Sequence, residues 1–127
     1  MSMWTTTKLS FGIDLGKGIP KNLYLTDDPD KEYEDRDGDV LNFFATWLHS
    51  KGKDFDFPFD ILTYCSYDYK YARYFLAYKP TIQTGSSDKP LLVKFPEVDV
   101  LKVTKMIEEN GFGTNVEPNW AIVSLYG

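Results

Sequence analysis

The sequence contains one cysteine and one histidine, Cys65 and His49, and only these two residues could act together as a nucleophile and its base. His49 lies opposite the apolar stripe of a predicted helix, so we expect it in solvent. Cys65 alternates with Thr63 and Tyr67 in a predicted strand, which favours a small core side chain. We therefore predict no catalytic centre. We also predict no metal site, because zinc would have to take nearly all its ligands from carboxylates.

A second group of chemically capable side chains is a run of acids. Residues 27–39 carry eight acidic and two basic residues, whereas the whole chain has a formal charge of −5. The rest of the chain is therefore close to neutral. Asp35, Asp37 and Asp39 are similar to a calcium loop, but an EF-hand has its glycine after the third acid and a glutamate at position twelve, where this chain has Thr46. The spacing does not support a calcium site.

We predict instead that the acidic segment binds a macromolecular partner, since charge complementarity steers association and gives specificity. One concrete version is an inhibitor of the kind that phages and other mobile elements encode, whose acidic loop mimics nucleic acid and fills a basic groove of a host protein. The residues assigned to partner binding are Glu32, Glu34, Asp35, Asp37 and Asp39. A protein partner is expected, and a homo-oligomer is a further option. The negative charge argues against nucleic acid as the partner.

The alternative function depends on an aromatic and cationic hairpin. Two segments rich in aromatic and β-branched residues, 60–67 and 71–79, are separated by three residues and predict a pair of strands. One face of the second strand combines tyrosine with Arg73, Phe75 and Lys79, and the sequence leaves open whether this face is exposed. If it is, the chain would be a small-ligand module for a nucleotide or another anion. Its ligand-binding residues would be Tyr67, Tyr71, Arg73 and Lys79.

Residues 11–17, Phe-Gly-Ile-Asp-Leu-Gly-Lys, resemble the first phosphate loop of actin and the Hsp70-type ATPases. Such enzymes need two large lobes and further nucleotide motifs, which do not fit in 127 residues. We therefore interpret the segment as the end of a strand, with Asp14 on the solvent face and the glycines in a turn.

The elements that position these side chains follow from hydrophobic periodicity. An apolar stripe from Val40 to Leu48 predicts a helix that ends near Gly52, and a second helix opens at Pro96-Glu-Val-Asp99 and ends at Gly111. Loops are predicted over 27–39 and 80–90. The predicted strands cover residues 8–15, 22–26, 60–67, 71–79, 91–95 and 119–126.

This order of elements predicts a single α+β domain over residues 1–127. We expect an antiparallel sheet with two helices on one face in the split βαβ (ferredoxin-like) order, with an N-terminal hairpin and the acidic loop as an insertion. No apolar run is long enough to cross a bilayer, and the N-terminus lacks the features of a secretory signal. The expectation is a cytoplasmic protein without a cofactor.

Overall fold

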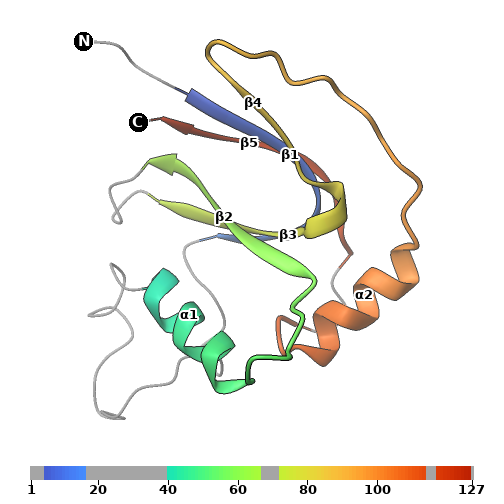
Figure 1. Cartoon of the computed structure of the whole chain (residues 1–127). Coiled ribbons are helices and arrows are strands. Elements are labelled where there is room, and N and C mark those ends of the chain that lie inside the picture. The colour runs from blue at the N-terminus through green and yellow to red at the C-terminus, as the bar shows by residue number, and fades with distance from the viewer. Residues whose placement is uncertain (1–4, 17–39, 67–71, 114–116, 127) are drawn as a thin grey trace.

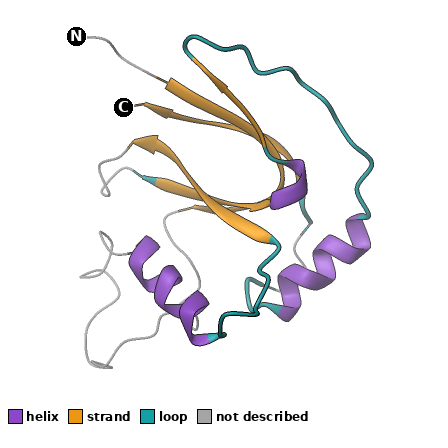
Figure 2. Ribbon diagram, in the orientation of Figure 1, coloured by secondary structure: helices purple, strands orange, loops and turns teal. Residues whose placement is uncertain are grey.

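A computed structural model describes residues 5–16, 40–66, 72–113 and 117–126, which form an α+β fold (Figures 1 and 2). The strands within these residues are β1 (Thr5–Gly16), β2 (Phe59–Ser66), β3 (Arg73–Tyr78), β4 (Gln83–Ser86) and β5 (Asn119–Tyr126). The helices are α1 (Val40–Ser50), the short 3-10 helix η3 (Lys79–Thr81) and α2 (Val100–Glu109). The predicted strand at 22–26 and the acidic loop lie outside the described residues.

Strand β1 organises the sheet. Its first half pairs with β4 along one edge and with β5 along the other, and its second half pairs with β3 in place of β4. Strand β2 is antiparallel to β3 and, at Cys65 and Ser66, parallel to β5. Figure 1 shows that β1 and β5 lie in one layer and that β2 and β3 lie in another, so the sheet folds over onto itself. The sheet is therefore mixed and not antiparallel as predicted.

The predicted split βαβ order is not confirmed. The pairs β2–β3, β3–β1 and β1–β5 are antiparallel, but a fifth strand joins β1, and β2 meets β5 in parallel. Two local predictions also differ from the structure. Residues 80–90, predicted as a loop, supply β4, whereas residues 91–95, predicted as a strand, run outside the sheet between Pro90 and Pro96.

The two predicted helices are confirmed, and they share one core. Phe44 and Trp47 of α1 and Val103 and Ile107 of α2 belong to a single cluster of buried side chains with β1, β2 and β3. We call this cluster the outer core. Its members from the strands include Phe11, Ile13, Phe59, Ile61, Tyr74 and Leu76, so both helices cover the same face of the sheet.

The predicted ends of α2 are also confirmed. The Asp99 carboxylate caps the helix by accepting a 3.1 Å hydrogen bond from the backbone N–H of Lys102. At the other end, Gly111 takes a left-handed φ of 84°, and the N–H of Phe112 reaches back to the carbonyl of Ile107 at 3.1 Å. Phe112 then enters the outer core, so the C-terminal cap also anchors the helix.

A smaller cluster, the inner core, lies on the opposite face of the sheet. It contains Leu62, Phe75, Ala77 and Val123, which come from β2, β3 and β5. Because β5 belongs to one layer and β2 and β3 to the other, these side chains fill the space inside the folded sheet. The consequence is that both faces of β3 are buried.

Candidate functional site

The residues assigned to the two predicted sites fall only partly within the described chain. Those outside it are the partner-binding residues Glu32, Glu34, Asp35, Asp37 and Asp39 and the ligand-binding residues Tyr67 and Tyr71. Their roles stay predictions. Arg73 and Lys79 are the two members of the predicted ligand site that the structure places.

Arg73 and Lys79 lie at opposite ends of β3. Arg73 begins the strand and is half-buried, with its guanidinium donating a 3.1 Å hydrogen bond to the carbonyl of Ala72. Lys79 is exposed in η3, beyond a strand that spans about 17 Å. Phe75 belongs to the face whose exposure the sequence left open, and it is buried in the inner core. The structure does not bring the two cations together.

Cys65 and His49 are both exposed. His49 lies in the last turn of α1, and its exposure was predicted. The prediction of Cys65 in the core is wrong. The pairing of β2 changes from β3 to β5 at this residue, which adopts a left-handed φ of 72°. This irregular backbone interrupts the alternation of the strand, so the side chain is exposed. Within the described ranges, no group of three or more His, Cys, Asp or Glu side chains could hold a metal ion.

A hydrogen bond between Tyr64 and Asp14 links β2 to the end of β1. The Tyr64 hydroxyl donates to Asp14 Oδ1 at 2.7 Å, and the same carboxylate oxygen accepts a 3.1 Å bond from the N–H of Gly16. Asp14 is exposed, as predicted from the alternation of β1. Burial and the bond to Asp14 raise the pKa of Tyr64 from 10.0 to about 12.

We expect the contribution of Tyr64 to the free energy of unfolding to be lost in alkali. Between pH 10 and about 12 the unfolded chain releases the Tyr64 proton while the folded chain retains it, so the free energy of unfolding falls as the pH rises through this window. Below pH 10 both states hold the proton, and Tyr64 adds no slope. Urea unfolding across this window should therefore show a shallower decline for Tyr64→Phe than for the wild type. A Tyr64→Phe protein with the wild-type slope would contradict this assignment.

Exposed apolar side chains concentrate between β4 and the first turn of α2. Of the seven large apolar side chains that are exposed in the described residues, five lie within residues 92–101. Leu92, Phe95 and Leu101 leave 72%, 63% and 82% of their surface in solvent. The five side chains, here called the apolar ridge, are Leu92, Val93, Phe95, Val100 and Leu101.

The first part of the apolar ridge is held on the sheet by its backbone and by one ring. Gln83 of β4 accepts a 2.8 Å hydrogen bond from the N–H of Lys94 and donates a 2.6 Å bond to the carbonyl of the same residue. The ring of Phe95 packs edge-on against Trp120 of β5, with centroids 5.2 Å apart. The exposed side chains therefore project from a segment whose position is defined.

Close packing at Gly85 fixes the segment further. A Cβ on Gly85 would lie 2.8 Å from the Cβ of Leu91, so only glycine allows Leu91 to rest on β4 at this distance. Pro90 and Pro96 flank the segment and lack the N–H groups that a central strand would need. Residues 91–95 therefore lie against the sheet without joining its ladder.

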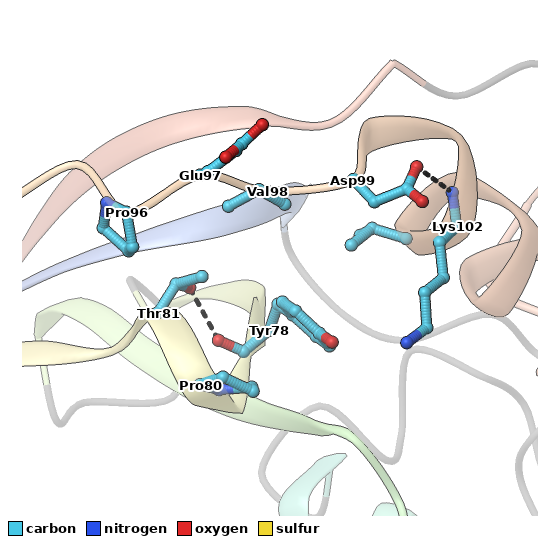
Figure 3. Close-up of a pocket in the computed structure, with 9 residues that line it drawn as sticks. Tyr78, Pro80, Thr81, Pro96, Glu97, Val98, Asp99 and Lys102 are labelled. Atoms are coloured by element: carbon cyan, nitrogen blue, oxygen red, sulfur yellow. Dashed lines mark hydrogen bonds between the residues drawn. The ribbon is translucent and has the colours of Figure 1, made fainter.

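Two open hollows adjoin the apolar ridge and share Pro80 and Pro96 in their walls. The larger hollow, about 570 Å³, is otherwise lined by Gln83, Leu92, Lys94 and Phe95. The smaller, about 250 Å³, lies between η3 and the start of α2 and includes Tyr78, Val98 and Lys102 in its lining (Figure 3). Because they share two residues, we treat the hollows as one groove and call it the proline groove.

No family model matches the chain, and neither the curated proteins nor the solved structures include a significant match. None of the helices in the described part of the chain is long and apolar enough to cross a membrane.

Proposed function

We propose that this chain is a non-catalytic binding domain that docks onto a protein partner through the apolar ridge. The observation that carries the proposal is the placement of five exposed large apolar side chains within ten consecutive residues. Burying a large apolar side chain stabilises a protein by about 1.5–3 kcal/mol, and this benefit is largely forgone at the apolar ridge. Contiguous exposed apolar surface is typical of interaction sites.

The anchoring of residues 91–95 supports the same proposal. The bonds from Gln83 to Lys94 and the packing of Phe95 on Trp120 hold the segment in place before a partner arrives. Association then requires less ordering of the binding segment, which favours affinity. A rigid apolar surface is thus suited to a protein contact.

The acidic segment completes the proposal as a second contact. Glu32, Glu34, Asp35, Asp37 and Asp39 would attract a basic surface of the same partner. The finer version is a cytoplasmic inhibitor from a mobile element, with the acidic segment in a basic groove of a host protein. Its distinctive expectation is that partner affinity falls steeply with salt and that Asp35→Asn, Asp37→Asn and Asp39→Asn together flatten this dependence.

The proposal is tested by quantitative affinity capture from a lysate of cells that make the protein. The wild type is compared with the double variant Leu92→Ser, Leu101→Ser, and Ile122→Ser is the matched control, since Ile122 is 61% exposed but lies outside the apolar ridge. All three should fold, because the altered side chains are exposed. We expect partners to be retained by the wild type and the control and lost by the double variant. Equal capture by all three proteins would refute docking through the apolar ridge.

A further inference from the structure

Strand β5 has one edge that is paired along its whole length and a second edge that is mostly unpaired. On one side it pairs with β1 from its first residue to its last. On the other side only its last two residues meet a strand, at Cys65 and Ser66 of β2. In Figure 1 the arrowheads of β2 and β5 accordingly lie next to each other. Along residues 119–124 no other strand of the described chain continues the sheet.

Two side-chain hydrogen bonds show which backbone groups of β5 face this open edge. In an antiparallel pair, two opposite residues exchange either both of their backbone hydrogen bonds or none, and the two kinds alternate. Phe11 and Trp120 lie opposite each other in β1 and β5. The Phe11 N–H donates to the Thr81 hydroxyl and the Trp120 N–H donates to Asn119 Oδ1, each at 2.9 Å. The pair of Phe11 and Trp120 is therefore of the kind that exchanges no bonds.

The alternation extends this assignment along the strand. Leu9 opposite Ile122 and Thr7 opposite Ser124 are pairs of the same kind, because they follow at two and four residues. The hydroxyls of Thr7 and Ser124 are 3.3 Å apart, which agrees with the closer side chains of such pairs. The N–H and C=O of Ile122, the N–H of Ser124 and the C=O of Trp120 therefore point away from β1, toward the open edge.

This edge lacks the features that protect strand edges in other proteins. Such edges are commonly short or carry charged residues or proline. Strand β4 is four residues long, and the exposed Asp60 lies on β2. Strand β5 has eight residues and no charged residue, proline or glycine, and Ile122 at its middle is 61% exposed. An unprotected apolar edge favours pairing with another extended strand.

We propose that a second copy of this chain covers the edge, with the two β5 strands antiparallel about a two-fold axis at Ile122. In this register the two Ile122 residues exchange both backbone hydrogen bonds, and each Trp120 C=O accepts from the Ser124 N–H of the other copy. The edge thus matches itself, as a two-fold interface requires. Because β5 is uncharged, no like charges meet, and the two Ile122 side chains cover each other. Pairing ends before Leu125, where β2 takes the edge.

Analytical ultracentrifugation of the full chain tests the proposal. A seam of about five residues buries little surface, so we expect a weak dimer whose population grows with concentration. Ile122→Lys should abolish the dimer, because two like charges would meet at the axis. Ile122→Val keeps a β-branched apolar side chain and is the matched control, which should dimerise as the wild type does. Both variants should fold, since Ile122 is exposed.

Disulfide cross-linking checks the register. The exposed Cys65 is first removed by Cys65→Ser, so that only an introduced thiol reacts. The Cα atoms of two opposite, hydrogen-bonded residues lie about 5.5 Å apart, which a disulfide can span. Air oxidation should therefore link two copies that carry Ile122→Cys. It should not link copies that carry Ser124→Cys, because the two Ser124 positions are offset by roughly 13 Å along the strands.

A wild type that stays monomeric at all concentrations, or a dimer that survives in Ile122→Lys, would overturn the inference. A dimer that dissociates in Leu92→Ser but not in Ile122→Lys would also overturn it, since the copies would then meet at the apolar ridge. The inference goes beyond the proposed function, because none of the five side chains of the apolar ridge lies on β5. Loss of lysate partners from Ile122→Lys with a monomeric wild type would assign the edge to a strand of another protein instead.

Discussion

Gly12→Ala should lower the free energy of unfolding by about 3 kcal/mol or more, or prevent folding altogether, because a Cβ on Gly12 would overlap the backbone carbonyl of Leu76. Neither strand can move away easily. Gly12 pairs with Ala77 on one side and with Asn119 on the other, and Leu76 is fully buried in the outer core. Urea unfolding followed by far-UV circular dichroism measures the loss.

Gly16→Ala is the matched control for this substitution. Gly16 ends the same strand with a φ of 66°, and a Cβ there would meet no atom within 4 Å. Gly16→Ala should therefore lower the free energy of unfolding only by the cost of a left-handed backbone at alanine, about 1–2 kcal/mol. If Gly12→Ala were no more destabilising than Gly16→Ala, the close approach of β1 to β3 would not be the reason for glycine at position 12.

Gly12 also shows where the sequence pattern stops being informative. Leu9, Phe11 and Ile13 recur at every second position of β1, which predicts a buried face, and all three are buried. The same alternation predicts Ser10 and Gly12 on the solvent face, but they are buried too. The interpretation of Gly12 as a turn residue is also wrong, because it pairs within β1 with Ala77 and Asn119. The burial of Ser10 and Gly12 comes from the folding of the sheet onto itself, which depends on pairings between β1, β3 and β5 that are distant in the sequence. A pattern of period two reports only on local alternation.

Elements with strong local signals were predicted well. The helix from Val40, the cap at Asp99 and the pair of strands around residues 67–71 each depend on neighbours in the chain, and the structure contains them. The prediction of a strand over residues 91–95 was wrong. Their apolar, β-prone side chains favour a strand, but the two flanking prolines oppose a central position in a sheet, and the segment lies outside the ladder. Strand β4 was missed for the opposite reason, since Gln-Thr-Gly-Ser has little strand propensity and is recruited by β1.

The candidate site was less predictable than the fold. An apolar run such as 91–95 is expected to be buried, and only the structure shows that Leu92, Val93 and Phe95 stay exposed. The proline groove joins residues from η3, the 92–99 segment and α2, so it is formed by tertiary packing. The cations that the sequence did single out, Arg73 and Lys79, are separated by the length of β3.

Trp47→Ala is also expected to have a large effect and to lower the free energy of unfolding by about 3–5 kcal/mol. Trp47 is 5% exposed and lies at the centre of an aromatic cluster. Its ring centroid is 5.7 Å from that of Phe44, 5.3 Å from Phe57 and 6.0 Å from Phe112. These rings come from α1, from the segment before β2 and from the end of α2, so alanine would leave a cavity where three parts of the chain meet.

Phe55→Ala is the matched control. The Phe55 ring lies at the rim of the cluster, with its centroid 6.2 Å from that of Trp47, and the residue is 37% exposed. Phe55→Ala should lower the free energy of unfolding clearly less than Trp47→Ala, since solvent and neighbouring side chains can fill the space that alanine leaves at the rim. Trp47→Phe should fall between the two, because it keeps an apolar ring in contact with Phe57. Calorimetry on the three variants checks this order, and a Trp47→Ala protein as stable as Phe55→Ala would show that the cluster does not hold α1 to the sheet. None of the five side chains of the apolar ridge belongs to the outer core that contains Trp47. Trp47→Phe should therefore retain partners in the lysate capture as the wild type does, which separates the packing that stabilises the fold from the surface proposed to bind the partner.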